Sequence, residues 1–293
     1  MKRKGTILSI VIAAASAMLL LVSFAQAAPP QADPSSIAKG GVLYDKWWKV
    51  VSGAKEPTTN QDLWATQTTN KLTGADTWRC KECHGWDYKG KDGAYGSGSH
   101  LTGFTGVYNA RAKTAAEIVA ILKGSANPKH DFSKVMDDAA LTDLANFLRE
   151  GVVDVSPYID SATKKAKGAD ASAGKTRYDS TCVSCHGKDG TQINFGTKDE
   201  PEYVGTVATN PWEFLHKVRA GQPGATMPSA IVAGWSLKDV ADVLAYAQTL
   251  PTAAPASLPK SGETFSTVWL LAGLAMAALA LGSLGWALRK RAR

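Results

Sequence analysis

The chain has 293 residues, a formal net charge of +7 and four cysteines. Three of its basic residues lie in residues 2–4 and four in residues 289–293, so the stretch from Ala28 to Leu288 is formally neutral. A charge excess confined to the two ends is not the basic face of a nucleic-acid-binding protein, and we exclude a nucleic-acid partner.

Residues 1–27 have the pattern of a secretory signal peptide. A basic start is followed by an apolar run from Thr6 to Phe24 and by the small-residue site Ala25-Gln26-Ala27, which predicts cleavage before Ala28. The apolar run is long for a signal peptide, so an uncleaved anchor is the alternative.

A helix is predicted near Ala38 to Val51, and a polar insert at about residues 52–78 separates it from the motif Cys80-Lys-Glu-Cys83-His84. We interpret the insert, which contains Trp64 and Trp78, as a surface loop packed over the edge of the site. Partner docking is its alternative role, since long structured loops are often functional. A Gly-rich loop at 85–106 and helices at 114–122 and 139–150 follow.

Residues 154–171, rich in Lys, Ala and Ser, are predicted to be a linker, after which the same order of elements returns. A short helix leads into Cys182-Val-Ser-Cys185-His186, followed by a loop at 187–205 and helices from about 210 and from 237 to 250. The first helices of the two units match through Gly41, Tyr44 and Asp45 in one and Gly174, Tyr178 and Asp179 in the other.

Both five-residue motifs have the C-x-x-C-H pattern of c-type haem attachment. Cys80 and Cys83, like Cys182 and Cys185, would bind one porphyrin through its two vinyl groups, and His84 and His186 would ligate the two irons. The motifs use every cysteine in the chain, which predicts two covalently bound haem c groups. A four-cysteine zinc site is the alternative, but it leaves both histidines unexplained and is disfavoured outside the cytoplasm.

The C-terminal region has the pattern of a membrane anchor. A Pro-containing stalk at 251–266 precedes an uncharged, Leu- and Ala-rich stretch at 267–288, long enough to cross a bilayer as a helix. The basic tail at 289–293 places the C-terminus in the cytoplasm by the positive-inside rule. We therefore expect a bacterial inner-membrane protein with a single C-terminal span and periplasmic haem domains.

The order helix, C-x-x-C-H, loop, helix, ligand and final helix resembles the cytochrome c family over Ala38 to Leu250, with the two motifs and Met227-Pro228 as its specific elements. The resemblance implies an all-α fold with two tandem cytochrome c-like domains, at 34–153 and 172–250, plus a transmembrane helix. It also implies electron transfer by covalently held haem.

The sixth iron ligands differ between the units. Met227 stands where the family places its axial methionine. Family members usually have this ligand about seventeen residues before the aromatic of the last helix, a spacing that selects His130 before Phe147. Met136 and His100 are the alternatives to His130. A His/His iron has a lower reduction potential than a His/Met iron, so electrons would run from the first haem to the second.

These features favour an electron carrier over an enzyme, because two six-coordinate irons leave no open site and no catalytic residue is assigned. The expected partners are a respiratory redox donor and an acceptor such as a terminal oxidase. The alternative is a cytochrome subunit or a catalytic di-haem enzyme, either a peroxidase or a dehydrogenase of a small inorganic sulfur or nitrogen compound. His216, within the helix from about 210, is predicted to be partly exposed and without a functional role.

Overall fold

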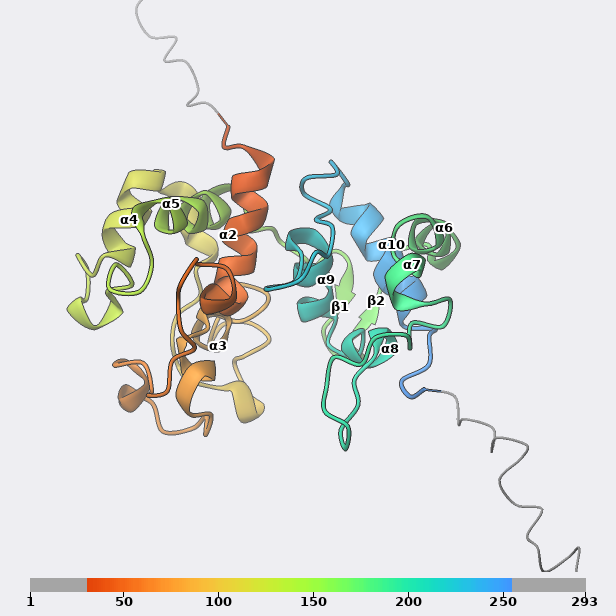
Figure 1. The fold of residues 1–293 in the computed structure, drawn as a ribbon, viewed down its shortest axis with the longest axis horizontal. Helices are drawn as coiled ribbons and strands as arrows, with labels where there is room; N and C mark the ends of the chain where they lie inside the picture. Colours follow the sequence, from red (N-terminus) through yellow and green to blue (C-terminus); the bar gives the residue numbers. More distant parts are fainter. Residues whose placement is uncertain (1–30, 255–293) are drawn as a thin grey trace, which may run out of the picture.

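The structure, a computed structural model, describes residues 31–254 (Figure 1). The predicted signal peptide, membrane span and cytoplasmic tail lie outside this range. Residues 31–254 form a mostly helical fold, in agreement with the predicted class. No helix between residues 31 and 254 combines the length and the apolar character that crossing a bilayer requires.

The elements of residues 31–152, called the first half, are α2 (Pro34–Lys46), η1 (Trp47–Lys49), η2 (Trp64–Thr66), η3 (Gly74–Trp78), α3 (Cys80–His84), η4 (Gly98–His100), η5 (Tyr108–Ala112), α4 (Ala115–Leu122), η6 (Pro128–His130), α5 (Asp138–Asn146) and the π turn η7 (Phe147–Gly151). The elements of residues 153–254, called the second half, are β1 (Ile159–Asp160), β2 (Lys165–Ala166), α6 (Ala171–Thr181), α7 (Val183–His186), α8 (Val204–Val207), α9 (Pro211–Ala220) and α10 (Leu237–Ala247).

Side chains at the helix starts explain where several of these helices begin. The Asp33 carboxylate accepts a hydrogen bond from the Ser35 amide at 2.7 Å. Thr114 and Ser236 begin α4 and α10 with reciprocal capping boxes, which satisfy backbone donors that have no partner within the helix. The Asp33 cap starts α2 at Pro34, four residues before the predicted start.

Buried hydrophobic side chains form two separate clusters, one in each half. The first helix of each half packs along the last one, so α2 lies against α5 and α6 against α10 (Figure 1). Phe147 and Leu144 are fully buried in the first cluster, and Leu244 and Tyr178 in the second. The helix order repeats between the halves, and the same helix pair closes each core.

Close contact within each helix pair depends on one glycine. A Cβ on Gly40 would lie 2.0 Å from the Asp143 carbonyl oxygen, and one on Gly174 would lie 1.9 Å from that of Asp242. Gly40, rather than Gly41, is therefore the equivalent of Gly174, which corrects the match expected from the sequence. Gly41 lies on another side of α2, where a Cβ would meet Ala220 of α9 at 2.5 Å.

Replacing Gly40 or Gly174 with alanine should lower the free energy of unfolding by about 1–3 kcal/mol, the usual cost of overpacking a core. The clash is with backbone, which cannot rotate away. Urea unfolding of the single variants would measure the loss. Ser35→Ala, on the exposed side of α2, should change stability by less than about 0.5 kcal/mol, and equal losses in all three variants would contradict the packing argument.

Residues 154–171, predicted to be a linker, contain a short antiparallel hairpin in which Ile159 pairs with Ala166 and Asp160 with Lys165. Val155 and Ile159 are buried in the second core. The Gln248 side chain accepts a hydrogen bond from the Ala166 amide at 3.0 Å and donates one to the Lys164 carbonyl at 2.8 Å. The hairpin is thus an integral part of the second half.

Helix α9 of the second half packs against α2 of the first (Figure 1). His216 is 2% exposed, and its ring nitrogens bond the Gly41 carbonyl at 3.0 Å and the Tyr88 hydroxyl at 2.9 Å. Arg219 donates to the Gly151 carbonyl at 2.7 Å. The prediction that His216 is partly exposed was wrong, because periodicity along α9 cannot reveal a contact with the other half.

Candidate functional site

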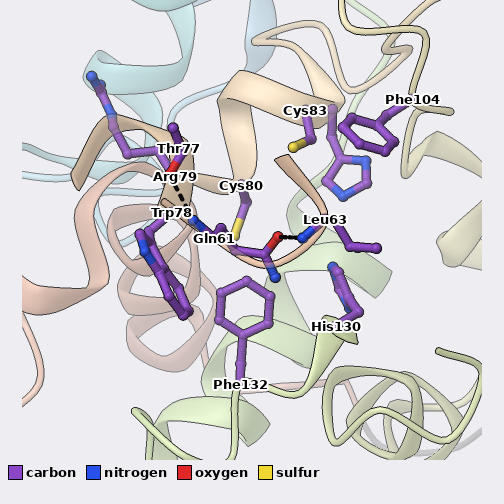
Figure 2. A pocket seen from close by; sticks show the side chains of 11 residues that line it. Gln61, Leu63, Thr77, Trp78, Arg79, Cys80, Cys83, Phe104, His130 and Phe132 are labelled. Carbon is purple, nitrogen blue, oxygen red and sulfur yellow. Dashed lines mark hydrogen bonds between the residues drawn. The ribbon is translucent and has the colours of Figure 1, made fainter. Parts of the chain in front are cut away.

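The first motif forms the short helix α3, and a pocket lies beside its two cysteines. The pocket is lined by Gln61, Leu63, Thr77, Trp78, Arg79, Cys80, Cys83, His84, Phe104, His130 and Phe132. Figure 2 shows the side chains of Cys80, Cys83, His130 and Phe132 around it. The pocket therefore combines both thiols, two imidazoles and an apolar lining.

The His84 ring is oriented by the loop that follows the motif. Its Nδ1 lies 2.7 Å from the Thr105 carbonyl oxygen, and a carbonyl can only accept, so Nδ1 carries the proton and Nε2 is left for a metal. Thr105 is held by a bridge to Gly90. Burial lowers the pKa of His84 to about 4, which keeps the ring neutral as a metal ligand must be.

His130, at the end of η6, lies across the pocket from His84. The two ring centroids are 6.2 Å apart and the rings are inclined at 77°. Metal–imidazole bonds of about 2.0 Å, with about 1.2 Å from nitrogen to ring centre, put two imidazoles on opposite sides of one metal about 6.4 Å apart. The spacing fits one iron between the rings. Burial lowers the pKa of His130 as well.

The two alternatives to His130 lie elsewhere. Met136 is 3% exposed and belongs to the first hydrophobic core. His100 stacks on Tyr95 with a centroid separation of 4.5 Å, and its Nδ1 lies 3.5 Å from a Glu82 carboxylate oxygen. Neither residue lines the pocket, so the geometry favours His130, whose role as an iron ligand stays a prediction.

The cysteines of the first motif lie in an apolar environment. Burial raises the pKa of Cys80 and Cys83 to about 12 and that of Cys182 to about 11. These groups are therefore thiols at neutral pH, whereas nucleophilic and metal-binding cysteines react as thiolates.

A buried ion-pair network holds the start of α3. Asp45 is 1% exposed and pairs with Arg79, the residue before Cys80, and with Lys217 of α9 at 2.8 Å. Arg79 and Lys217 hold the pKa of Asp45 well below its usual range, although its burial acts in the opposite direction. The network joins α2, the first motif and the second half.

The second motif forms α7, and its environment is more open. Cys182 is half-buried and Cys185 is exposed. The His186 ring lies 5.6 Å from that of Phe195, and burial lowers its pKa. Among the described residues, its Nδ1 is buried without a hydrogen-bond partner, so no carbonyl orients this ring as Thr105 orients His84.

Met227 is half-buried and packs against the second core. It also lines a surface groove together with Lys39, Val42 and Lys49 of the first half. Backbone bonds around it tie this segment to α9, since the Ala230 amide donates to the Val218 carbonyl at 3.0 Å. The assignment of Met227 and His186 as the ligands of one iron stays a prediction.

Within residues 31–254, no three His, Cys, Asp or Glu side chains gather in a cluster able to hold a metal ion. The four cysteines therefore do not share one zinc site. Both motifs instead have the donor set of a c-type haem site: two thiols on one turn and a neutral imidazole next to them. The first site adds a second imidazole, and its residues fit the group that the motif predicts.

Sequence reasoning missed the residues that support the ligands. Thr105 acts through its carbonyl, which any residue type would provide, so no sequence signal marks it. Gln61 lies in the insert, whose position over the pocket agrees with the predicted surface loop. Only the length of the insert pointed to it.

One comparison with known proteins gives a match. A family model described as cytochrome c oxidase, cbb3-type, subunit III matches residues 169–246. No curated protein and no solved structure matches the chain. The matched residues include the second motif and Met227. This similarity, together with the C-x-x-C-H motif, supports a c-type cytochrome, an electron-transfer protein with covalently bound haem c.

Proposed function

We propose that the protein is a membrane-anchored di-haem cytochrome c that carries electrons in the periplasm. It would accept them from a respiratory donor and pass them to an acceptor such as a terminal oxidase. The observation that carries the proposal is the pairing of His84 and His130 across a pocket that both Cys80 and Cys83 line. These four side chains are the attachment points and ligands that a c-type haem needs, and they lie in the first half. The family model matches only the second half, at residues 169–246.

The residues of the first site would bind and shield the group. Haem c, when bound, supplies an iron that takes up and releases one electron. Cys80 and Cys83 would fix the porphyrin, and the Thr105 carbonyl fixes the tautomer and orientation of His84. Phe104, Phe132 and Leu63 line the pocket with apolar side chains, which would keep water from the group and reduce the reorganisation that accompanies a change of charge.

The two sites differ in their proposed sixth iron ligand, and this difference would set the direction of electron transfer. Two imidazoles at the first site would stabilise ferric iron, whereas a thioether from Met227 at the second would raise the reduction potential. Electrons would therefore move from the first haem to the second. The contact of α9 with α2 supports this route, because it holds the two halves against each other.

Similarity to an oxidase subunit favours an oxidase complex as acceptor. The predicted membrane span at 267–288 would keep the haem domains near such a complex and raise their local concentration there. The same features suit a subunit of an oxidase or dehydrogenase complex. If His130 and Met227 each ligate an iron, neither iron would have an open site, and an independent enzyme is the weaker alternative.

Haem counting tests the proposal. The full-length protein, made in a host that matures c-type cytochromes, should contain two haems per chain by the pyridine haemochrome assay. Cys80→Ala with Cys83→Ala should leave one, and so should Cys182→Ala with Cys185→Ala, because each motif attaches its own haem. A wild-type protein with one haem, or one that stays in the soluble fraction after cell lysis, would contradict the proposal.

A further inference from the structure

The insert at 52–78 distinguishes the first half from the second. In the second half, α6 leads directly into the haem motif, whereas residues 47–79 separate α2 from α3. Four residues of the insert, Gln61, Leu63, Thr77 and Trp78, line the pocket. The insert thus forms a wall of the first site that has no counterpart in the second.

Gln61 connects this wall to the segment that carries His130. Its side chain is 6% exposed and donates from Nε2 to the Lys129 carbonyl at 2.7 Å. Its Oε1 accepts a hydrogen bond from the Leu63 amide at 2.6 Å, which Figure 2 shows as a dashed line. Both polar ends of the amide are therefore engaged, one inside the insert and one next to His130.

The insert itself holds Gln61 in place. The Gln61 amide donates to the Thr77 hydroxyl at 2.9 Å, and that hydroxyl donates to the Gly74 carbonyl at 2.7 Å. Thr77 is buried, and Trp78 packs edge-on against Phe132, two residues beyond His130. Contacts inside the insert thus hold Gln61 in place, independently of its hydrogen bond to the Lys129 carbonyl.

The His130 segment has little structure of its own. It is a three-residue 3-10 turn, capped by Asn127, whose side chain accepts from the Lys129 amide at 3.0 Å. Beyond His130, the chain is anchored by an isolated bridge between Asp131 and Lys123, next to which the Phe132 amide donates to the Leu122 carbonyl. A turn of this length does not fix an imidazole unaided, because its hydrogen bonds are few and poorly aligned.

We propose that Gln61 is a positioning residue for His130. By bonding the carbonyl that precedes His130, it keeps the imidazole at the distance from His84 that one iron requires, and it closes the first haem to outside ligands. This inference deepens the proposed function and rests on its His/His first site.

Gln61→Leu tests the inference in the full-length, haem-loaded protein. The variant should lose part of the low-spin His/His EPR signal. Its ferrous first haem should bind carbon monoxide with an affinity raised about tenfold or more, the size of effect typical when a supporting partner of a metal ligand is removed. Gln61→Glu, which keeps the shape but replaces the donor by a carboxylate, should show the same change and serves if the Leu variant does not load haem.

Gln67→Leu is the matched control. Gln67 lies in the same insert, but its side chain bonds only Asn70 and Thr69, so this variant should match wild type. Unchanged EPR and carbon monoxide binding in both Gln61 variants would overturn the inference, and so would an equal change in Gln67→Leu. A wild-type protein with two haems but no His/His signal would also overturn it while leaving the di-haem proposal standing.

Discussion

His130→Ala should convert the first haem from a low-spin His/His centre to a high-spin one that binds carbon monoxide. His130 is the side chain that faces His84 at a spacing suited to one iron, and alanine supplies no ligand. Low-temperature EPR and the reduced-plus-carbon monoxide spectrum would measure the change. His130→Met should instead keep the iron six-coordinate and raise the reduction potential of the first haem, as thioether ligation does.

The two alternative ligands provide the controls for this experiment. His100→Ala and Met136→Leu should leave the His/His signal unchanged, because His100 stacks on Tyr95 and Met136 lies in the core. An unchanged spectrum in His130→Ala, or loss of the signal in one of the other two variants, would reject His130 as the ligand. A redox titration in which the first haem has the higher potential would reject the proposed direction of electron flow.

Asp45→Asn should lower the free energy of unfolding by about 3–5 kcal/mol, the usual effect of breaking a buried ion pair. The substitution leaves Arg79 and Lys217 without their shared carboxylate. Both are largely buried, so water cannot replace it fully. Urea unfolding of the haem-loaded protein at neutral pH would measure the loss.

The same carboxylate makes the effect depend on pH. The pKa of Asp45 in the folded protein is below that of an ordinary aspartate because of Arg79 and Lys217. The Asp45 carboxylate therefore stabilises the fold fully above about pH 4. This stabilisation is lost as the pH falls toward the pKa that Asp45 has in the folded protein. The difference between wild type and Asp45→Asn should be largest at neutral pH and shrink in acid.

Asp76→Asn is the control for this prediction. Asp76 also pairs with Arg79, at 3.1 Å, but its side chain is 45% exposed. Its loss should cost less than about 1 kcal/mol, as for other exposed ion pairs. Two results would show that burial of the Asp45 network is not what stabilises the fold. One is an equal loss of unfolding free energy in Asp45→Asn and Asp76→Asn. The other is a difference between wild type and Asp45→Asn that does not depend on pH.

The helices could be predicted from the sequence because their signals are local. The capping residues and the apolar spacing mark α4, α9 and α10 within a few residues of their observed bounds. For the helices, the pattern and the structure that it predicts lie in the same stretch of chain. The spacing that selects His130 comes from the family resemblance; the structure places this residue across the pocket from His84, and its role as an iron ligand stays a prediction.

The features that could not be predicted depend on contacts between distant segments. The burial of His216 follows from the packing of α9 on α2, and the hairpin at 159–166 is fixed by Gln248, far along the chain. Gln61 acts on Lys129 through a single amide in a polar stretch without periodicity. Hydrophobic patterning reports which face of an element is buried, but not which distant group buries it.

The contact between α2 and α9 is asymmetric, because it uses a surface of α2 that α6 does not repeat. Gly41 admits Ala220 of α9 because it has no side chain, but its equivalent on α6 is Lys175, which is exposed and paired with Asp179. The surface of α2 that receives α9 is therefore a property of the first half that α6 does not share.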